Sequence, residues 1–447
     1  MVYRNAHPNR DDPVGLPKDE RTLAEHLQEL GYDTQMVGKW HIGYCKNEFS
    51  PTFRGFNGHF GYWNGAIEYW NHTVISPMPL NFLGRDMRNG MDRVEDSQGT
   101  YATKLFTDKA VEIIANHDND QPLFLYLAHM APHGPMVNAL LAPPEVASRF
   151  SYIDDDFRRD TVANIVLLDQ AIGEIVRALD DAGMLENSII VFSSDNGGNT
   201  GPMVLAGTGD SSNYPLKGTK RSLFEGGTRV PGFIFSPLIS ARSRLSSKLT
   251  HMADWFPTLY AAAGGNVSEI LSQTELDSFN QWNWLAEGEG PVGDYAIREE
   301  MLYNIDENIP TAAIRIGKWK YITGPQTINN LIVNVSLNGW FGDSGRLNLT
   351  TQEDLDAYND VLEWTSQMNL AGQILSRKGW LPSEEIMQEL RRAAEVQCND
   401  DGSGGFCDPG VAPCLFDIEA DPCEKNNLLA SDQEDCVIRN QAWNAKK

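Results

Sequence analysis

Two uninterrupted apolar runs, LFLYLA at 123–128 and IIVF at 189–192, constrain the fold of this chain more than any other feature. Neither run alternates polar with apolar residues, which is typical of strands covered on both faces of a sheet. Between them, roughly residues 157–182 have a helical pattern that ends at Gly183. A buried strand, a helix and a second buried strand form a βαβ unit, so we predict an α/β protein with a parallel sheet.

Further segments extend this pattern toward both ends of the chain. They are, in order, a helix opened by the capping box TLAE at 22–25 and stopped by Gly31, a strand at 34–37, a strand at 230–235, a helix through 254–263, a β-hairpin over 312–322 and helical segments near 353–377 and 383–397. The alternation of strands and helices gives way to the hairpin and a Cys-rich tail beyond about residue 285. We therefore predict a first domain over 1–285 and a smaller α+β domain over 286–447.

Polar side chains follow the ends of the predicted strands. In open α/β sheets, ligands bind at the carboxyl ends of the strands. Each of these side chains also has a plain structural interpretation, such as a turn for Asp-Asn-Gly-Gly or a solvated charge for a lysine. The candidates are Lys39, His41, His133, Asp195, Asn196 and Lys220.

Taken together, these residue types suit one kind of chemistry. Asp195 and Asn196 offer oxygens of the kind that Ca²⁺ or Mg²⁺ prefers. Lysines neutralise the oxygens of a tetrahedral anion, and histidines move protons. The sequence therefore predicts a cation site flanked by two lysines and two histidines, suited to a tetrahedral dianion or monoester.

The charge of the chain excludes some partners. Its formal net charge is −25, which argues against binding to nucleic acid, so an anionic substrate must meet a local basic pocket. No apolar run approaches the length of a membrane span.

Cysteines and glycosylation sequons indicate the compartment. Five of the six cysteines fall in the last 50 residues without zinc-finger spacing, so we interpret them as disulfide-forming. Four sequons, at Asn71, Asn266, Asn334 and Asn348, also favour the secretory pathway, lysosomal or extracellular. The stretch MVYRNAHPNRDDPVG has no apolar core of a signal peptide.

Four motifs together resemble the type I sulfatases in order and spacing: VGKWHIG at 37–43, APHGP at 131–135, SDNGG at 194–198 and PLKGTK at 215–220. The resemblance covers nearly the whole chain. It is closest to the arylsulfatase B (N-acetylgalactosamine-4-sulfatase) branch, through FRGFNGHFGY at 53–62 and AIRIGKWK at 313–320.

The resemblance implies an alkaline-phosphatase-like α/β sheet sandwiched by helices, a small C-terminal domain, and hydrolysis of sulfate esters such as those of glycosaminoglycan sugars. Asp195 and Asn196 would be calcium ligands. Lys39 would neutralise the nucleophile and the sulfate, and His41 would be the base that releases sulfate from a covalent intermediate. His133 and Lys220 would bind the sulfate and assist the leaving oxygen.

One departure from the family pattern concerns the nucleophile. The family uses a formylglycine made from the Cys or Ser of a C/S-x-P-x-R motif, which does not occur in the 447 residues. The stretch CDPGV at 407–411 begins like it but lacks the Arg. The resemblance also implies an N-terminal Asp-Asp pair of calcium ligands after an apolar strand. Asp11-Asp12 follow no such strand, so we interpret that pair as a solvated loop. We expect that this chain begins just after the nucleophile segment and is inactive as given.

Two other functions stay open at this point. A phosphatase or phosphodiesterase of the same superfold would use more metal-ligating Asp and His and fewer lysines. A glycan-binding pseudoenzyme would keep the pocket and lack the nucleophile. The sequence upstream of Met1 would discriminate the second alternative from an incomplete chain.

Overall fold

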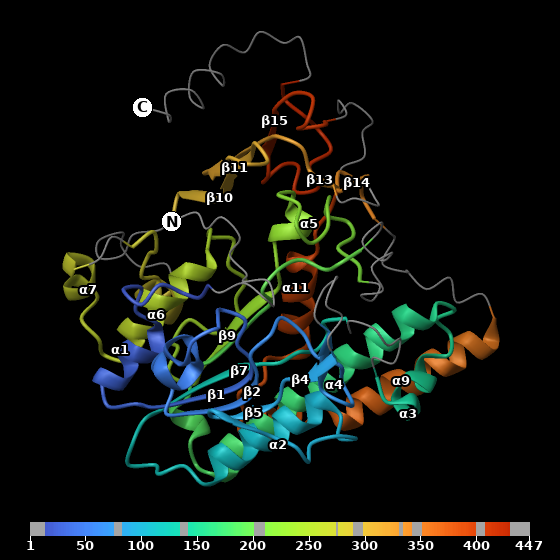
Figure 1. Ribbon diagram of the computed structural model, residues 1–447. Coiled ribbons are helices and arrows are strands. Elements are labelled where there is room, and N and C mark those ends of the chain that lie inside the picture. Colours follow the sequence, from blue (N-terminus) through green and yellow to red (C-terminus); the bar gives the residue numbers. More distant parts are fainter. Residues whose placement is uncertain are drawn as a thin grey trace.

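A five-stranded sheet forms the core of the computed structural model, which describes residues 14–75, 83–134, 142–200, 211–273, 276–288, 298–329, 334–341, 351–398 and 407–429 (Figure 1). The strand order is β6-β5-β2-β1-β7. Its centre is parallel, because β1 (Asp33–Lys39) runs alongside β2 (Gly58–Tyr62) and β7 (Leu123–Ala128) in the same direction. The short strands β5 (Arg88–Asn89) and β6 (Asp92–Arg93) add an antiparallel edge.

Helices cover both faces of this sheet, as the α/β prediction requires. On one face lie α2 (Ala102–Ala115) and α4 (Asp156–Asp181), and Phe106 of α2 packs with Val37 of β1. On the other face lie α1 (Leu23–Glu29) and α6 (Trp255–Ala262), where Leu27 and Tyr260 share a cluster with Phe124 of β7. The predicted α/β class is therefore confirmed.

The strand after α4 departs from the prediction. Strand β8 (Ile190–Ser193) pairs antiparallel with β9 (Gly232–Phe235) and not with the five-stranded sheet, and all of its residues are half-buried. Strand β7 also has an edge without a paired strand: among the described residues it pairs only with β1. Tyr126 of β7 is 49% exposed. The expectation that both strands are fully covered was wrong, because a strand with an unpaired edge lacks the neighbour that would cover its side chains.

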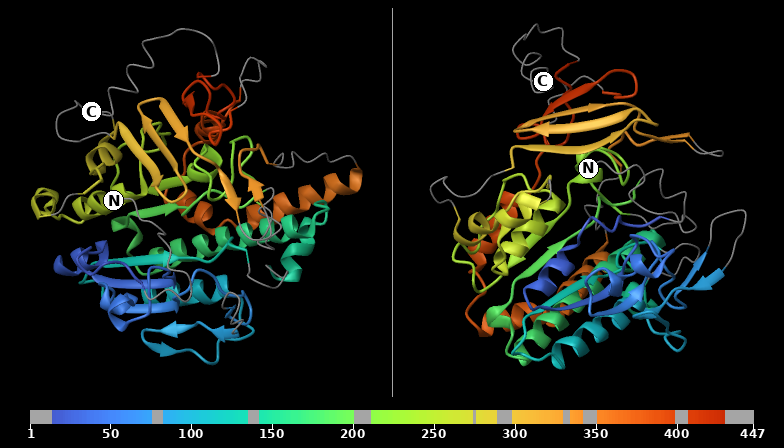
Figure 2. Two further views of the ribbon diagram at one scale, coloured as in Figure 1. Left: turned by 45° about the horizontal axis from the view of Figure 1, so that its top comes forward. Right: turned by 60° about the vertical axis from the view of Figure 1, so that its left-hand side comes forward.

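The C-terminal part contains a four-stranded antiparallel sheet in the order β10-β11-β12-β15, shown in orange and red at one end of the molecule in Figure 2. It is formed by β10 (Glu300–Asp306), β11 (Thr311–Ile316), β12 (Trp319–Thr323) and β15 (Cys414–Asp417). The predicted hairpin is confirmed as β11 and β12, and Gly317 between them has a positive φ of 54°.

The helices of the C-terminal part pack away from that sheet. The predicted helix near 353–377 is two helices, α9 (Gln352–Met368) and α10 (Leu370–Arg377), divided at Asn369, whose side chain caps α10 by accepting from the Gly372 amide. In α10, Ile374 shares an apolar cluster with Val176 and Leu179 of α4. The domain division at residue 285 stays a prediction.

The remaining elements are short. They are β3 (Thr73–Ile75), β4 (Leu83–Arg85), α3 (Pro144–Ala147), α5 (Glu225–Thr228), α7 (Val267–Gln273), α8 (Trp282–Glu287), β13 (Thr327–Asn329), β14 (Asn334–Ser336) and α11 (Glu384–Ala394). In the described ranges, no helix has the length and apolar character that crossing a bilayer would need.

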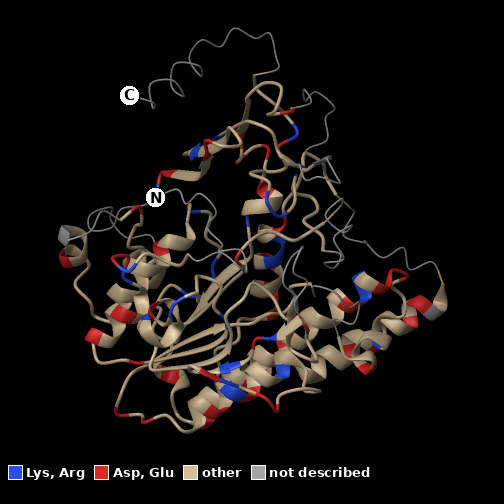
Figure 3. Cartoon of the chain, viewed as in Figure 1, with Lys and Arg blue, Asp and Glu red and all other residues tan. Residues whose placement is uncertain are grey.

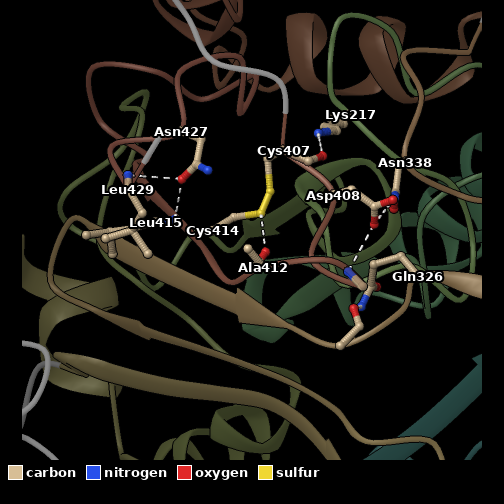
Figure 4. The surroundings of a disulfide bond; sticks show 12 residues. Lys217, Gln326, Asn338, Cys407, Asp408, Ala412, Cys414, Leu415, Asn427 and Leu429 are labelled. Atoms are coloured by element: carbon tan, nitrogen blue, oxygen red, sulfur yellow. Dashed lines mark hydrogen bonds between the residues drawn. A yellow bond between two sulfur atoms is a disulfide. The ribbon is translucent and has the colours of Figure 1, made fainter. Parts of the chain in front are cut away.

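Two disulfides brace the C-terminal tail, as predicted: Cys398–Cys423 and Cys407–Cys414, the second drawn in Figure 4. Cys45 is exposed with a free thiol, and Cys436 lies outside the described residues. Among the sequon asparagines, Asn266 is exposed and Asn71 is half-buried, whereas Asn348 and the side chain of Asn334 lie outside the description.

Candidate active site

Lys39 and His41 lie at the carboxyl end of β1. Lys39 is the last residue of the strand, and Trp40 continues the register by donating its amide to the Tyr62 carbonyl at 2.9 Å. His41 then adopts a left-handed backbone with φ 55°, while its amide donates to the Trp63 carbonyl at 3.1 Å. A positive φ is uncommon in a residue with a side chain, so the surrounding contacts fix this turn and the direction of the imidazole.

His133 lies in the loop after β7 and is fixed at three backbone or side-chain atoms. Its amide donates to the Met130 carbonyl at 2.7 Å, and its carbonyl accepts from the Tyr69 hydroxyl at 2.9 Å. Its Nδ1 lies 2.7 Å from the Gly134 carbonyl. A carbonyl can only accept, so Nδ1 carries the proton and the neutral ring has its lone pair at Nε2.

The Asp195-Asn196-Gly197-Gly198 turn follows β8 and is bonded to the loop that carries Lys220. The Lys220 amide donates to the Gly198 carbonyl at 3.0 Å, and the Gly197 amide donates to the Gly227 carbonyl at 3.0 Å. A Cβ at position 197 would lie 1.9 Å from the Gly226 carbonyl oxygen, so this approach of two backbones requires glycine. The turn interpretation and the site interpretation of this motif are therefore compatible.

Electrostatics link four of the six candidate residues. Burial lowers the pKa of Lys39, and the Asp195 carboxylate opposes that shift while Lys220 adds to it. Burial likewise lowers the pKa of Lys220, against the raising effect of Asp195. The carboxyl ends of β1, β7 and β8 and the Lys220 loop thus place Lys39, His133, Asp195 and Lys220 within electrostatic reach of one another.

The neutral state of His133 follows from this environment. Burial, and then the ammonium groups of Lys39 and Lys220, lower its pKa to about 4. The two other candidates are attached through the backbone, since His41 lies two residues beyond Lys39 and Asn196 follows Asp195.

The described residues do not by themselves form a calcium site. Within the described ranges, no group of three or more His, Cys, Asp or Glu side chains is arranged to hold a metal ion. Asp195, which is exposed, and Asn196 could supply two oxygens, whereas Ca²⁺ takes about six to eight. The predicted pair is therefore too small a ligand set on its own.

Two residues that shape the site, Asn213 and Arg221, were not predicted from the sequence. The side-chain amide of Asn213 accepts from the Gly198 amide at 2.7 Å and donates to the Gly198 carbonyl at 2.8 Å, so it fixes the turn after Asn196. Arg221 is exposed and has a left-handed φ of 76°. It lowers the pKa of its neighbour Lys220, by less than burial lowers it and by less than Asp195 raises it. Neither residue has a sequence signal, because Asn before Tyr-Pro and Arg after Lys are ordinary loop residues.

The cationic site contrasts with the rest of the molecule. Figure 3 shows Asp and Glu residues spread over the helices and outer loops. In a chain with net charge −25, two partly buried lysines beside a neutral histidine form a local exception. Such a local concentration of positive charge favours an anion of limited size over a long polyanion.

The sequence of the chain matches known proteins over much of its length. The sequence profile of the Sulfatase family matches residues 2–265. The chain is 33% identical to mouse arylsulfatase J over 391 residues, which is 81% of this chain and 60% of that protein. It is 28% identical to human N-acetylgalactosamine-6-sulfatase over 265 residues, which is 58% of this chain and 48% of that protein. The chain thus spans about half to three fifths of the length of these curated relatives.

Two solved structures match the fold of the chain. The crystal structure of Ps i-CgsB in complex with k-i-k-neocarrahexaose matches with a TM-score of 0.58 and 25% identity, over 88% of this chain and 83% of that chain. A crystal structure of PsFucS1 sulfatase from Pseudoalteromonas matches with a TM-score of 0.58 at 18% identity, which supports the fold alone.

Proposed function

The chain belongs to the sulfatase family, and on that premise we propose that it hydrolyses sulfate esters, with sulfated glycan sugars as its substrate class. The observation that carries the proposal is the convergence of Lys39, Lys220 and a neutral His133 at one end of the sheet. A sulfate ester places its charge on non-bridging oxygens, and ammonium groups in a partly desolvated site stabilise such charge strongly.

Each candidate residue has a role in this proposal. Lys39 and Lys220 bind the sulfate oxygens and stabilise the charge that develops as the sulfuryl group is transferred. His133 lies within electrostatic reach of both lysines with Nε2 unprotonated. A bound anion would raise the pKa of the ring, and the protonated Nε2 would then donate a hydrogen bond to the anion. His41 is the base that would release sulfate from a covalent intermediate. Asp195 and Asn196 supply part of a calcium site, and we assign no step to the ion.

The relatives support the substrate class, and the disulfides and a sequon support the compartment. Human N-acetylgalactosamine-6-sulfatase is named for a sugar sulfate, and Ps i-CgsB was crystallised with an oligosaccharide. The two disulfides and the exposed Asn266 sequon support passage through the secretory pathway. We therefore propose a lysosomal or extracellular enzyme that acts on sulfated sugars.

One sequence feature favours a second candidate function. Because the C/S-x-P-x-R motif does not occur in the 447 residues, the chain could bind a sulfated glycan without cleaving it. The two functions share the same anion site and differ only in turnover.

Titration calorimetry with inorganic sulfate tests the shared site. We expect the 447-residue chain to bind sulfate, and Lys220→Ala to weaken binding by at least tenfold. Lys104→Ala is the matched control, since Lys104 is exposed on α2 and pairs with Asp108 at 2.6 Å. Equal sulfate affinity in wild type and Lys220→Ala would contradict the proposed site.

A further inference from the structure

A buried ionic cluster joins the C-terminal sheet to the loop that carries Lys220. The ammonium of Lys320 in β12 donates to Oε1 of Glu225 at 2.8 Å and lies 3.0 Å from Oε1 of Glu424. The three side chains are between 0% and 3% exposed. Glu225 begins α5, five residues after Lys220, and Glu424 lies in the tail after β15.

Contacts continue from Glu225 to both loops of the candidate site. Its own amide donates to Oε2 of Glu424 at 2.7 Å. The next residue, Gly226, donates its amide to the Lys217 carbonyl at 2.6 Å, within the same loop as Lys220. The carbonyl of Gly227 accepts from Gly197 in the turn after Asn196. The first turn of α5 therefore rests on the cluster on one side and touches the site loops on the other.

The backbone of Glu424 is itself constrained. Its φ is 54°, a left-handed conformation that is unfavourable for a side chain of this size. The preceding Cys423 is fixed by its disulfide to Cys398 and by the Trp340 indole, which donates to its carbonyl at 2.9 Å. Figure 4 shows the second disulfide, whose Cys407 carbonyl accepts from the Lys217 ammonium at 3.4 Å. The tail is thus built to present Glu424 inward.

We propose that Lys320, Glu225 and Glu424 are positioning residues for the Lys220 loop and the Asp195–Asn196 turn, and that proton binding by Glu424 controls how firmly they hold these loops. The imbalance of charge carries the second half of the proposal, because two carboxylates face one ammonium at contact distance. The other groups that face the cluster are the Tyr303 hydroxyl, 3.3 Å from Glu225, and, at longer range, Lys217, Arg229 and Arg315.

The direction of the pH effect follows from the environment of Glu424. Burial, opposed by Lys320 and aided by Glu225, raises its pKa from 4.5 to about 7. A carboxyl with a raised folded-state pKa contributes stability that is complete below its unfolded pKa and is lost as pH rises through the folded value. The stability that the protonated cluster contributes therefore declines between about pH 4.5 and 7, while the folded cluster itself loses its neutral state around pH 7. We infer that the site loops are held more firmly in mildly acidic solution than above pH 7.

Glu424→Gln is the decisive variant, because it keeps the shape of the side chain and fixes its charge at zero. Buried histidines also titrate in this range, so the informative quantity is the ratio of folding constants of wild type and variant at each pH. Between about pH 5 and 7 we expect the folding constant of wild type, divided by that of the variant, to fall close to tenfold per pH unit. Glu419→Gln, an exposed glutamate in the same tail, should leave this ratio unchanged.

Hydrogen exchange tests the positioning role without enzymatic turnover, although that role rests on the proposed function. After correction for the intrinsic rate, peptides covering 193–200 and 217–229 should exchange faster at pH 8 than at pH 6 in wild type and equally at both pH values in Glu424→Gln. Peptides from α2 should not differ. A Lys320→Met variant, if folded, should exchange faster in both loops at either pH. A pH-dependent folding ratio with unchanged exchange in the loops would reduce the cluster to a structural anchor, and a constant ratio would overturn the proposal entirely.

Discussion

Gly65 leaves the space that the imidazole of His41 occupies: a Cβ at position 65 would lie 2.6 Å from Cε1 and 2.8 Å from Nε2 of His41. His41 has a constrained backbone, with φ 55° and its amide bonded to the Trp63 carbonyl. The ring could yield to a methyl group only by moving away from Gly65. The position of the proposed base is therefore set by a residue that takes no part in the chemistry.

Gly65→Ala should displace His41 and slow the proposed reaction. A shift of about 1 Å in a reacting group can cost about 10²-fold in rate. We expect a fall of that order in kcat for aryl sulfate hydrolysis by a form of the protein that carries the nucleophile. Gly84→Ala is the control, since a Cβ there meets no atom within 4 Å. Equal rates in the two variants would mean that the position of His41 is irrelevant.

The sequence predicted the sheet elements well because their patterns are local. The capping box at Thr22 and the run of Leu123–Ala128 each depend on neighbouring residues, and α1 and β7 begin where those patterns indicated. The half-exposed state of β8 could not be predicted, because apolar residues alone do not reveal which strand lies beside them. The pairing of β8 with β9 joins residues 39 to 45 positions apart, from Ser193–Gly232 to Ile190–Phe235.

The candidate site divides in the same way. Side chains at strand ends, such as Lys39 and His133, could be proposed from the sequence because a parallel sheet brings the carboxyl ends of neighbouring strands, here β1 and β7, together. The contacts that hold the loops of the site in place could not be predicted from the sequence. Asn213 and the Glu225–Lys320 pair act across 15 and 95 residues, and a single sequence contains no signal for such pairs.

The 447-residue chain should not hydrolyse a generic aryl sulfate. The C/S-x-P-x-R motif does not occur in the 447 residues, so we expect no formylglycine and no covalent oxygen nucleophile in this chain. Release of a chromogenic phenol, measured with purified protein, gives the result directly. Hydrolysis that His41→Ala abolishes would show that another residue of this chain is the nucleophile.

In a form that carries the nucleophile, alanine at Lys39, His41, His133 or Lys220 should each remove most of the activity. Loss of one group that stabilises the transition state typically costs about 10²–10³ in rate. The change should fall mainly on kcat/KM for aryl sulfate, and Lys104→Ala should be unaffected. If two of the four variants retained wild-type rates, the assignment of roles would be wrong.

His133 should titrate far below an ordinary histidine. Burial and the two lysines lower its pKa to about 4, against 6.5 for the unperturbed group. The stability contributed by the neutral ring is therefore present above about pH 6.5 and is lost as pH falls toward 4. NMR should follow its Cε1 proton with a midpoint near 4 that rises when sulfate is added. A midpoint near 6.5 that sulfate does not change would place His133 outside the anion site.

Asp195 and Asn196 should bind calcium only weakly in this chain. One carboxylate and one amide supply about one negative charge, and calcium affinity follows the number and charge of the ligands. Lys39 and Lys220, which lie within electrostatic reach of Asp195, oppose a cation further. By calorimetry, we expect calcium to bind this chain with a dissociation constant on the order of 1 mM, like the weakest natural sites. We expect no calcium binding in Asp195→Ala. A longer form that carries the N-terminal Asp-Asp pair implied by the sulfatase resemblance should bind calcium more tightly. Asp92→Ala, at an exposed aspartate on β6, should leave binding unchanged. Micromolar binding to this chain, lost in Asp195→Ala, would mean that further ligands lie among residues assigned no such role.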